Sequence, residues 1–269
     1  MEDILHKIIA NKRIEVEEQK KLVPFQALLK LVEKQSYQTK SMRRSLAESP
    51  FGIIAEFKRK SPSKGWLHPD AEIADIVPAY EKGGASACSV LTDKDYFGGS
   101  LDDLQKARSL VNIPLLRKDF IIDPYQLFQA RLVGADAILL IASCLKPEEC
   151  LSLAKTAHSL EMEVLLEIHN EAELEHLNPH IDMWGVNNRN LGTFHIDINN
   201  SFRLMEQMQK HISRFGETAP LLIAESGISN AETVLQLREA GFRGFLIGET
   251  FMKTEQPGDT LSSFIKTLS

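Results

Sequence analysis

Apolar runs and amphipathic segments alternate along the chain from residue 51 onward. Eight β-branched or leucine-rich runs are predicted as strands: 52–58, 85–93, 113–120, 136–143, 163–169, 182–189, 220–227 and 243–249. The segments between them, such as DLQKARSLV and AETVLQLREAG, carry apolar residues at helical spacing, and Gly241 ends the latter as a natural C-cap. Nearly continuous apolar strands that alternate with helices predict a parallel sheet covered by helices.

Eight such units favour a (β/α)8 barrel, the TIM-barrel fold, over an open doubly wound sheet. No G-x-G-x-x-G motif follows the first predicted strand, which also argues against a dinucleotide-binding sheet. The expected fold class is therefore α/β, with one barrel over residues 51–269 and an N-terminal helical extension over residues 1–50. We expect one structural domain in which the extension covers one end of the barrel.

The extension itself shows helical periodicity. A first predicted helix has one apolar face, formed by Ile4, Leu5, Ile8 and Ile9. A second helix is expected to begin near Pro24 and to turn inward Leu28, Leu29 and Val32. The segment 35–49 is polar and is predicted to be a connector between the extension and the barrel.

Composition narrows the class of protein. The 269 residues are 43% hydrophobic with a formal net charge of -6, which excludes a disordered chain and disfavours a nucleic-acid binder. The longest apolar runs, such as AILLIA, are too short to span a bilayer. The chain has three cysteines without C-x-x-C spacing, namely Cys88, Cys144 and Cys150. This cysteine usage suits a reducing compartment, so we expect a cytoplasmic protein. The net charge and the short apolar runs predict that it binds neither nucleic acid nor membrane.

Polar residues stand where most of the predicted strands end. Two lysines and three glutamates are among them, in the set Glu56, Lys58, Lys118, Glu167, Asn187, Arg189, Glu225 and Ser226. The carboxyl ends of the strands meet at the catalytic face of a (β/α)8 barrel, and side chains two residues apart share a face. A polar mouth on an apolar barrel predicts an active site.

Each of these residues also has a simpler interpretation. Glu56 and Lys58 could form an internal ion pair, and Lys118 could belong to a charged loop cluster. The Asn-rich stretch 187–190 could be a plain turn, although an Arg beside several Asn also suits carboxylate recognition. For Glu167 a functional role is favoured over a structural one, because a buried strand should not end in an acid without cause.

No metal site is predicted. His176 and His180 have i, i+4 spacing, but Pro179 interrupts any helix there. A phosphate site is predicted instead, after the last two strands. Gly227 follows Glu225-Ser226, and Gly248 precedes Glu249, at the loops that usually bind phosphate in this fold.

Several stretches together resemble the indole-3-glycerol phosphate synthase family of tryptophan biosynthesis. They are IIAEFKRKSPSKG, SVLTDKDYFGGS, PLLRKDFIIDPYQLFQARLVGADAILLI, LLEIHN, GVNNRNL, AESGI and FLIGETFM, in the family's order and spacing. The opening LHKIIANKRIEVEEQK also resembles the family's N-terminal extension. Trp66 departs from the family, which commonly has an aliphatic residue there.

The resemblance implies a lyase that uses no metal and no organic cofactor. It would close the indole ring of 1-(2-carboxyphenylamino)-1-deoxyribulose 5-phosphate and release carbon dioxide and water. The expected partner is this small phosphorylated substrate. A monomer is expected, with at most weak association with other enzymes of tryptophan biosynthesis.

The resemblance also implies a role for each site residue. Lys118 would be the principal general acid, with Lys58 sharing this work. Glu167 would be the base in dehydration, Glu56 would orient the lysines, and Asn187 would bind near the reacting centre.

The remaining residues would bind the substrate. Arg189, Ser226 and Glu225 match substrate-binding positions, and the anthranilate ring would pack on Phe97, Phe120 and Leu139. The phosphate would be held by Ser61, Gly227, Gly248 and the backbone of Glu249.

A lysine can serve as an acid near neutral pH if neighbouring cations or burial lower its pKa. Two lysines that converge on one mouth are expected to lower it, while the glutamates restrain this effect. Two alternatives stay open at this point. One is another phosphate-binding barrel, such as a phosphoribosyl isomerase, which would not need the two lysines and their glutamates. The other is a barrel that binds phosphate without turnover, which would lack an acid or a base.

Overall fold

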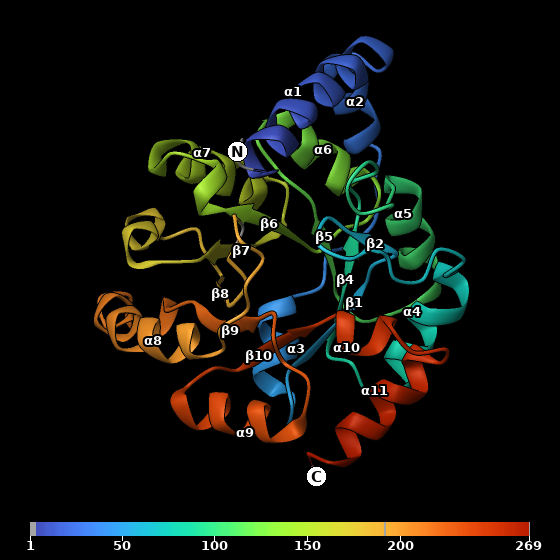
Figure 1. The fold of residues 1–269 in the computed structure, drawn as a ribbon. Coiled ribbons are helices and arrows are strands. Elements are labelled where there is room, and N and C mark those ends of the chain that lie inside the picture. Colours follow the sequence, from blue (N-terminus) through green and yellow to red (C-terminus); the bar gives the residue numbers. More distant parts are fainter. Residues whose placement is uncertain (1–3, 191, 269) are drawn as a thin grey trace.

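The fold is a closed parallel barrel. The computed structural model describes residues 4–190 and 192–268, so Leu191, which ends the GVNNRNL stretch, lies outside the described residues. Within these ranges the strand order is β1-β10-β9-β8-β7-β6-β5-β4, with every neighbouring pair parallel (Figure 1). The strands are β1 (Ile53–Phe57), β4 (Ala87–Leu91), β5 (Leu115–Lys118), β6 (Ala137–Ile141), β7 (Glu163–Ile168), β8 (Met183–Asn187), β9 (Leu221–Glu225) and β10 (Gly244–Ile247). The predicted (β/α)8 barrel is confirmed.

Helices surround the barrel, most of them between successive strands and the last two after β10 (Figure 1). They are α4 (Ile73–Lys82), α5 (Leu101–Leu110), α6 (Pro124–Leu132), α7 (Pro147–Ser159), α8 (Asn199–Ile212), α9 (Ala231–Ala240), α10 (Glu249–Met252) and α11 (Pro257–Lys266). Short 3-10 turns add η1 (Ala142–Cys144), η2 (Glu171–His176) and η3 (Gly216–Thr218), and a hairpin of β2 (Lys60–Ser61) and β3 (Gly65–Trp66) follows β1. The connection from β7 to β8 passes through η2 instead of an α-helix.

Local sequence signals fix the ends of these helices. The side chain of Asn230 accepts a hydrogen bond from the N–H of Thr233, which caps the start of α9. The same helix ends at Gly241, whose φ of 117° lies in the left-handed region, as the sequence predicts. Asp123 and Gln126 form a reciprocal capping box at the start of α6.

Alternation along the strands divides the buried residues into two cores. One core lies between the strands and the helices and includes Phe57, Val90 and Trp184. The other lies inside the barrel and includes Ile54 and Leu116. Because side chains alternate faces, each strand contributes to both cores, which explains why its residues are buried almost without exception.

The predicted connector 35–49 is wrong, because it contains the helix α3 (Met42–Glu48). Ser41 caps this helix by accepting a hydrogen bond from the N–H of Arg44. Met42 and Leu46, one turn apart, are 0% and 1% exposed and join the core inside the barrel. The many polar residues around these two concealed the apolar stripe, which closes the N-terminal end of the barrel.

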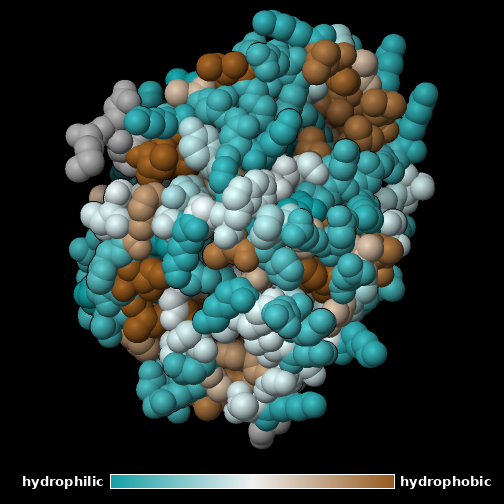
Figure 2. All heavy atoms as spheres, turned by 45° about the vertical axis from the view of Figure 1, so that its right-hand side comes forward, coloured by the Kyte–Doolittle hydropathy of each residue, from teal (hydrophilic) through white to brown (hydrophobic). Residues whose placement is uncertain are grey.

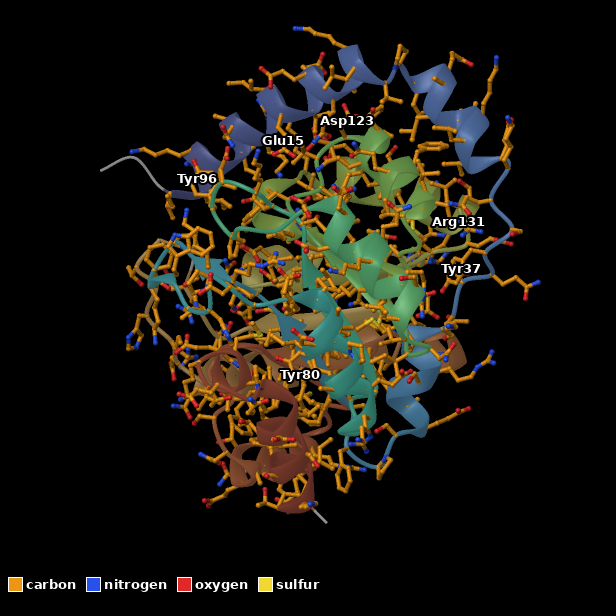
Figure 3. All side chains as sticks on the ribbon, turned by 90° about the vertical axis from the view of Figure 1, so that its right-hand side faces the viewer. Glu15, Tyr37, Tyr80, Tyr96, Asp123 and Arg131 are labelled. Atoms are coloured by element: carbon orange, nitrogen blue, oxygen red, sulfur yellow. The ribbon has the colours of Figure 1, made fainter. Side chains whose placement is uncertain are left out.

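Helix α1 (Ile4–Leu22) lies at the opposite end, where the strands finish, and helix α2 (Phe25–Val32) packs against α6 on the outside of the barrel (Figure 3). Tyr125 fixes α1 by donating a hydrogen bond shared between the backbone carbonyls of Gln19 and Val23. Leu28 of α2 is buried as expected. The expected cover of one barrel end is therefore too simple, because α1 lies at one end and α3 at the other.

Two further findings concern the described part of the chain. None of its helices is both long and apolar enough to cross a membrane. Its His, Cys, Asp and Glu side chains form no group of three placed to hold a metal ion. His176 instead contacts the backbone carbonyls of Leu145 and Glu173, and so serves the packing of η2.

Candidate active site

A lysine and two glutamates meet inside the mouth of the barrel. Lys118 ends β5, and its Nζ lies 3.0 Å from Glu167 Oε2 and 3.0 Å from Glu225 Oε2. The three residues come from three strands separated by β6 and β8. Period two along each strand turns them all inward, so the tertiary closure of the sheet builds this cluster.

A second ion pair faces the first across the barrel. Lys58 Nζ lies 2.5 Å from Glu56 Oε1, and the Glu56 side chain is almost fully buried. Two glycines make room for these carboxylates. A Cβ on Gly248 would lie 2.4 Å from Glu56 Oε1, and a Cβ on Gly185 would lie 2.3 Å from Glu225 Oε1. The lack of a side chain at Gly185 and Gly248 therefore makes room for the two carboxylates in the packed mouth of the barrel.

The electrostatic balance at Lys118 differs from the expected one. Burial alone would lower the pKa of Lys118, but the carboxylates of Glu167, Glu225 and Glu56 outweigh it and raise this pKa above its usual value. The expected lowering by a second lysine is wrong for the site without substrate. Lys58 is paired with its own glutamate, so carboxylates dominate around Lys118.

The two glutamates that share Lys118 have pKa values displaced in opposite directions. Burial raises the pKa of Glu225 to about 7; Lys118 opposes this shift and the charge of Glu167 adds to it. Burial would also raise the pKa of Glu167, but Lys118, His169 and Asn187 reverse the effect and lower it. Two acids with opposite shifts around one lysine are a common sign of acid–base catalysis.

His169 supports the ionised state of Glu167. Its Nε2 lies 3.3 Å from Glu167 Oε1, and its Nδ1 lies 3.4 Å from Glu173 Oε2. Burial lowers the pKa of His169, but the proximity of these two acids outweighs it and raises the pKa to about 9. His169 is absent from the site residues predicted from sequence, because a lone His two residues beyond a strand end is usually a loop residue.

One cavity contains most of the predicted residues. Its lining includes all five proposed catalytic residues, together with Arg189, Ser226, Glu225, Phe97, Phe120 and Leu139. Of the predicted phosphate ligands, Ser61 and Glu249 line it, whereas Gly227 and Gly248 are absent from the lining that the described residues form. The structure therefore gathers nearly the whole predicted set around one cavity.

The cavity has an apolar side and a polar side. On the apolar side the rings of Phe97 and Phe120 lie 6.0 Å apart at 41°. Helix α1 closes this side with Ile4, Leu5 and Ile8, which the sequence analysis placed on an apolar face without assigning them to the site. An apolar helical face predicts that the helix is buried on that side, but it does not identify the surface against which it packs.

The polar side is formed by loops after β1, β8 and β10. Arg189 donates hydrogen bonds to Ser63 Oγ at 3.0 Å and to Glu249 Oε2 at 3.3 Å. Lys64 contacts the same glutamate, so the hairpin after β1 is tied across the mouth. Ser226 has a φ of 64°, a strained value for a residue other than glycine and one that clusters at functional sites.

Fold and site together define a (β/α)8-barrel enzyme with a lysine–carboxylate centre at the catalytic end of its strands. The chain matches the family model of indole-3-glycerol phosphate synthase over residues 5–264. It belongs to this family, so the resemblance seen in the sequence is confirmed. A lyase of tryptophan biosynthesis, the expected enzyme class, is confirmed with it.

Individual relatives agree along their whole length. An indole-3-glycerol phosphate synthase of Bacteroides thetaiotaomicron is 56% identical, with 100% of both chains covered. Another, of Polaromonas naphthalenivorans, is 42% identical over 97% of this chain and 98% of that one. Among solved structures, a mutant tryptophan synthase alpha-subunit from Pyrococcus furiosus has a TM-score of 0.59 at 14% identity, covering 81% of this chain and 97% of that one. That likeness supports the barrel fold.

Proposed function

We propose that this cavity converts 1-(2-carboxyphenylamino)-1-deoxyribulose 5-phosphate into indole-3-glycerol phosphate, carbon dioxide and water. One observation carries the proposal: a lysine held by glutamates lies in the same cavity as an apolar wall formed by the rings of Phe97 and Phe120. The substrate has the matching order of parts, with an aromatic ring at one end, a carbonyl in the middle and a phosphate at the other end.

The two sides of the cavity orient this substrate. The anthranilate ring packs between Phe97, Phe120 and Leu139, against the apolar face of α1. The phosphate lies at the opposite side, where Ser61 and the backbone of Gly227, Gly248 and Glu249 receive it. Arg189 supports the charge network there, and Ser226 turns the chain toward the substrate.

Ring closure needs a proton at the carbonyl oxygen. As the carboxyl-bearing ring carbon bonds to the ribulose C2, the carbonyl electrons move onto oxygen, and Lys118 donates a proton to it. The ring carboxylate then leaves as carbon dioxide, and its bonding electrons restore the aromatic ring. A raised pKa in the free site keeps Lys118 charged before reaction, and the developing alkoxide is basic enough to take the proton.

Dehydration completes the pyrrole ring. Glu167, held ionised by its neighbours, takes a proton from the C1 methylene carbon. The electrons of that C–H bond form the ring double bond as the C2 hydroxyl leaves, and a lysine proton converts it to water. Lys58 shares this acid work, Glu56 orients Lys58, and Asn187 holds the reacting centre near Glu167.

The decisive assay incubates the purified protein with this substrate and follows indole fluorescence together with released carbon dioxide. We expect both signals in a one-to-one ratio. The matched control is the same compound without its ring carboxylate, which has no carbon dioxide to lose. Substrate that binds but never turns over would overturn the proposal and leave a phosphate-binding barrel without catalysis.

Further parts of the proposal concern the whole chain. Residues 1–50 and 51–269 form one structural domain, which is supported by α1 lining the cavity and α3 closing the barrel. The enzyme works as a monomer, because one chain supplies an acid, a base and both sides of the cavity. It works in the cytoplasm, which is supported by a cysteine usage that suits a reducing compartment. The molar mass of the purified protein, measured by light scattering, tests whether it is a monomer.

Weak association with other enzymes of tryptophan biosynthesis is part of the same proposal. Figure 2 shows hydrophobic side chains at the top of the view, where α1 and α2 lie. Leu22, Phe25 and Leu31 of this region are 82%, 40% and 47% exposed, which gives such a contact an apolar surface.

A further inference from the structure

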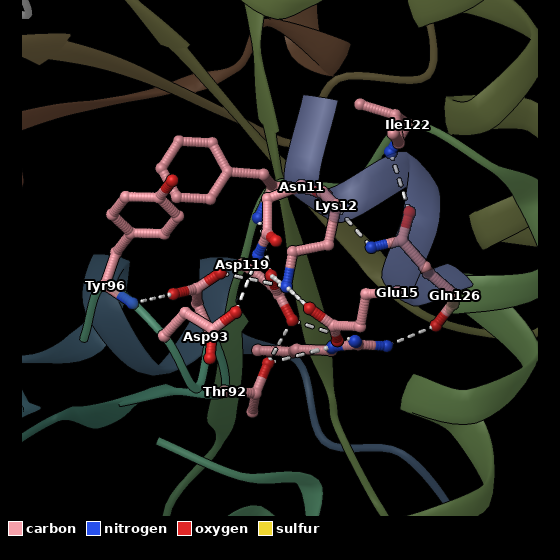
Figure 4. A network of polar contacts seen from close by, with 12 residues as sticks. Asn11, Lys12, Glu15, Thr92, Asp93, Tyr96, Asp119, Ile122 and Gln126 are labelled. Carbon is pink, nitrogen blue, oxygen red and sulfur yellow. Dashed lines mark hydrogen bonds and ion pairs between the residues drawn. The ribbon is translucent and has the colours of Figure 1, made fainter. Parts of the chain in front are cut away.

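Helix α1 carries a buried lysine that no proposed step of the reaction uses. The side chain of Lys12 is 1% exposed, and lysine is almost never buried unless it is paired. Its Nζ lies 2.9 Å from Asp119 Oδ1, 3.0 Å from Asp93 Oδ2 and 2.7 Å from Glu15 Oε2 (Figure 4). Lys12 therefore joins α1 to the ends of two strands of the barrel, β4 and β5.

The two aspartates each fix the backbone beside a phenylalanine of the ring pocket. Asp93 Oδ1 accepts a hydrogen bond from the N–H of Tyr96 at 2.8 Å, one residue before Phe97. Asp119 Oδ1 accepts one from the N–H of Phe120 at 2.8 Å. The two loops that carry Phe97 and Phe120 are thus both anchored to carboxylates that share Lys12.

Asp119 also sits directly after the proposed general acid, Lys118. Its second oxygen accepts hydrogen bonds from Thr92 Oγ1 at 2.6 Å and from Arg117 at 2.9 Å. Arg117 holds this carboxylate from β5, on the strand face that packs against α6, whereas Lys12 holds it from α1. Two buried cations face two buried carboxylates, so the loss of either lysine or arginine would leave a buried charge without a partner.

We propose that Lys12 is a positioning residue for the reaction. Its ammonium ties the ends of β4 and β5 together, and this sets the two phenylalanines and Lys118 in their working geometry. Lys12 is not part of the cavity lining formed by the described residues, so it acts through Asp93 and Asp119. The role rests on the proposed function, and it makes α1 a working part of the site as well as its cover.

The test uses a neutral replacement and its charge-balanced partner. Lys12→Met keeps the length of the side chain but leaves one carboxylate uncompensated, so its Tm should fall by roughly 10 °C. The double variant Lys12→Met/Asp93→Asn restores neutrality, and the amide oxygen that replaces the carboxylate can still accept the hydrogen bond of Tyr96. It should recover most of the lost Tm while the link between the strand ends stays broken.

A matched control is available on the same helix. Lys20 Nζ lies 2.7 Å from Asp123 Oδ2, and both side chains are about a third exposed. Lys20→Met thus also removes an ion pair between α1 and the barrel, but it does not touch Asp93 or Asp119. Any effect of loosening α1 in general will appear in this control as well.

Two readouts decide the role. In the double variant the amides of Tyr96 and Phe120 should exchange hydrogen at least about tenfold faster than in the wild type. Its kcat should fall by about tenfold or more, because small displacements of reacting groups are costly. Lys20→Met should leave both quantities near the wild-type values.

Protected amides in the double variant, with kinetics equal to those of Lys20→Met, would overturn the positioning role. An activity loss that only follows Tm across all variants would overturn it too. If the wild type itself fails to turn over the substrate, the proposed function fails separately. The exchange rates of the two amides would then still decide whether Lys12 fixes the loops.

Discussion

The two ends of the barrel use acidic residues in different ways. At the N-terminal end, the carboxylates of Asp136 and Glu163 are engaged by backbone and side-chain donors on both oxygens. Asp136 accepts hydrogen bonds from the N–H groups of Lys40 and Leu115, both at 2.7 Å, and Glu163 accepts one from the N–H of Arg43 at 2.8 Å. These acids tie the incoming chain and the strands together.

At the mouth the carboxylates are left short of donors. Glu225 and Glu167 share Lys118, and Glu225 Oε1 accepts no hydrogen bond from any described residue. A buried polar atom without a partner costs free energy, so its presence indicates a site prepared for a ligand or for proton transfer. The same residue type thus stabilises one end and supplies reactivity at the other.

The largest expected effect removes the cation on which the mouth depends. Lys118→Met should lower kcat by about three orders of magnitude, because it deletes the proposed general acid. Its Tm should fall as well, because Glu167 and Glu225 would lose the buried cation that they share. Rates of ring closure measured by indole fluorescence, with Lys106→Met on exposed α5 as control, check this. A rate within tenfold of the wild type would move the principal acid role to another group.

The opposite result is expected at the closed end. Leu46→Ala should lower the free energy of unfolding by about 2–5 kcal/mol, because a fully buried side chain of α3 leaves a cavity in the core inside the barrel. Urea unfolding measures this loss. The kcat of the folded protein should stay within about twofold of the wild type. A large drop in kcat without a loss of stability would erase the contrast between the two ends.

The smallest expected effect concerns the dependence of the mouth on pH. Burial raises the pKa of Glu225 to about 7, so this side chain becomes ionised as the pH rises through 7. Ionisation adds a charge beside Lys118 that holds it more firmly and repels the substrate carboxylate. The wild-type kcat/KM should therefore fall above pH 7, and this fall should be absent in Glu225→Gln.

Thermal stability gives an independent check of the same shift. The folded protein holds the Glu225 proton more tightly than the unfolded chain, whose glutamate has a pKa near 4.5. The stabilisation is complete below pH 4.5 and is lost as the pH rises through 7. Glu225→Gln should thus gain Tm relative to the wild type above pH 7. Equal pH profiles for both proteins would mean that Glu225 does not titrate there.

Much of the barrel and its site could be predicted from local pattern. Strands such as 136–143 were recognisable because buried parallel strands read as short apolar runs between helices. Glu167 stood out because an acid ends such a run. The strand ends share one edge of a parallel barrel, so residues far apart in sequence could be assigned to one mouth.

The misses share a physical cause. Met42 and Leu46 were hidden because a two-residue stripe among polar neighbours has little periodic signal. The face of α1 was visible, but its contact with Phe97 depends on a docking across some 90 residues of chain. The direction of the pKa shift at Lys118 depends on a count of charges from several strands, which no single stretch contains.

By itself, the sequence determined the class of fold, the order of its strands and the residues that end them. Hydrophobic periodicity acts between near neighbours, so the chain carries this information locally. Only the tertiary structure decided which acids share Lys118, which ends of the barrel α1 and α3 cover, and that Lys12 is buried between Asp93 and Asp119. Those relations depend on distances between distant segments, and electrostatic interactions follow distance and burial, whatever the separation in sequence.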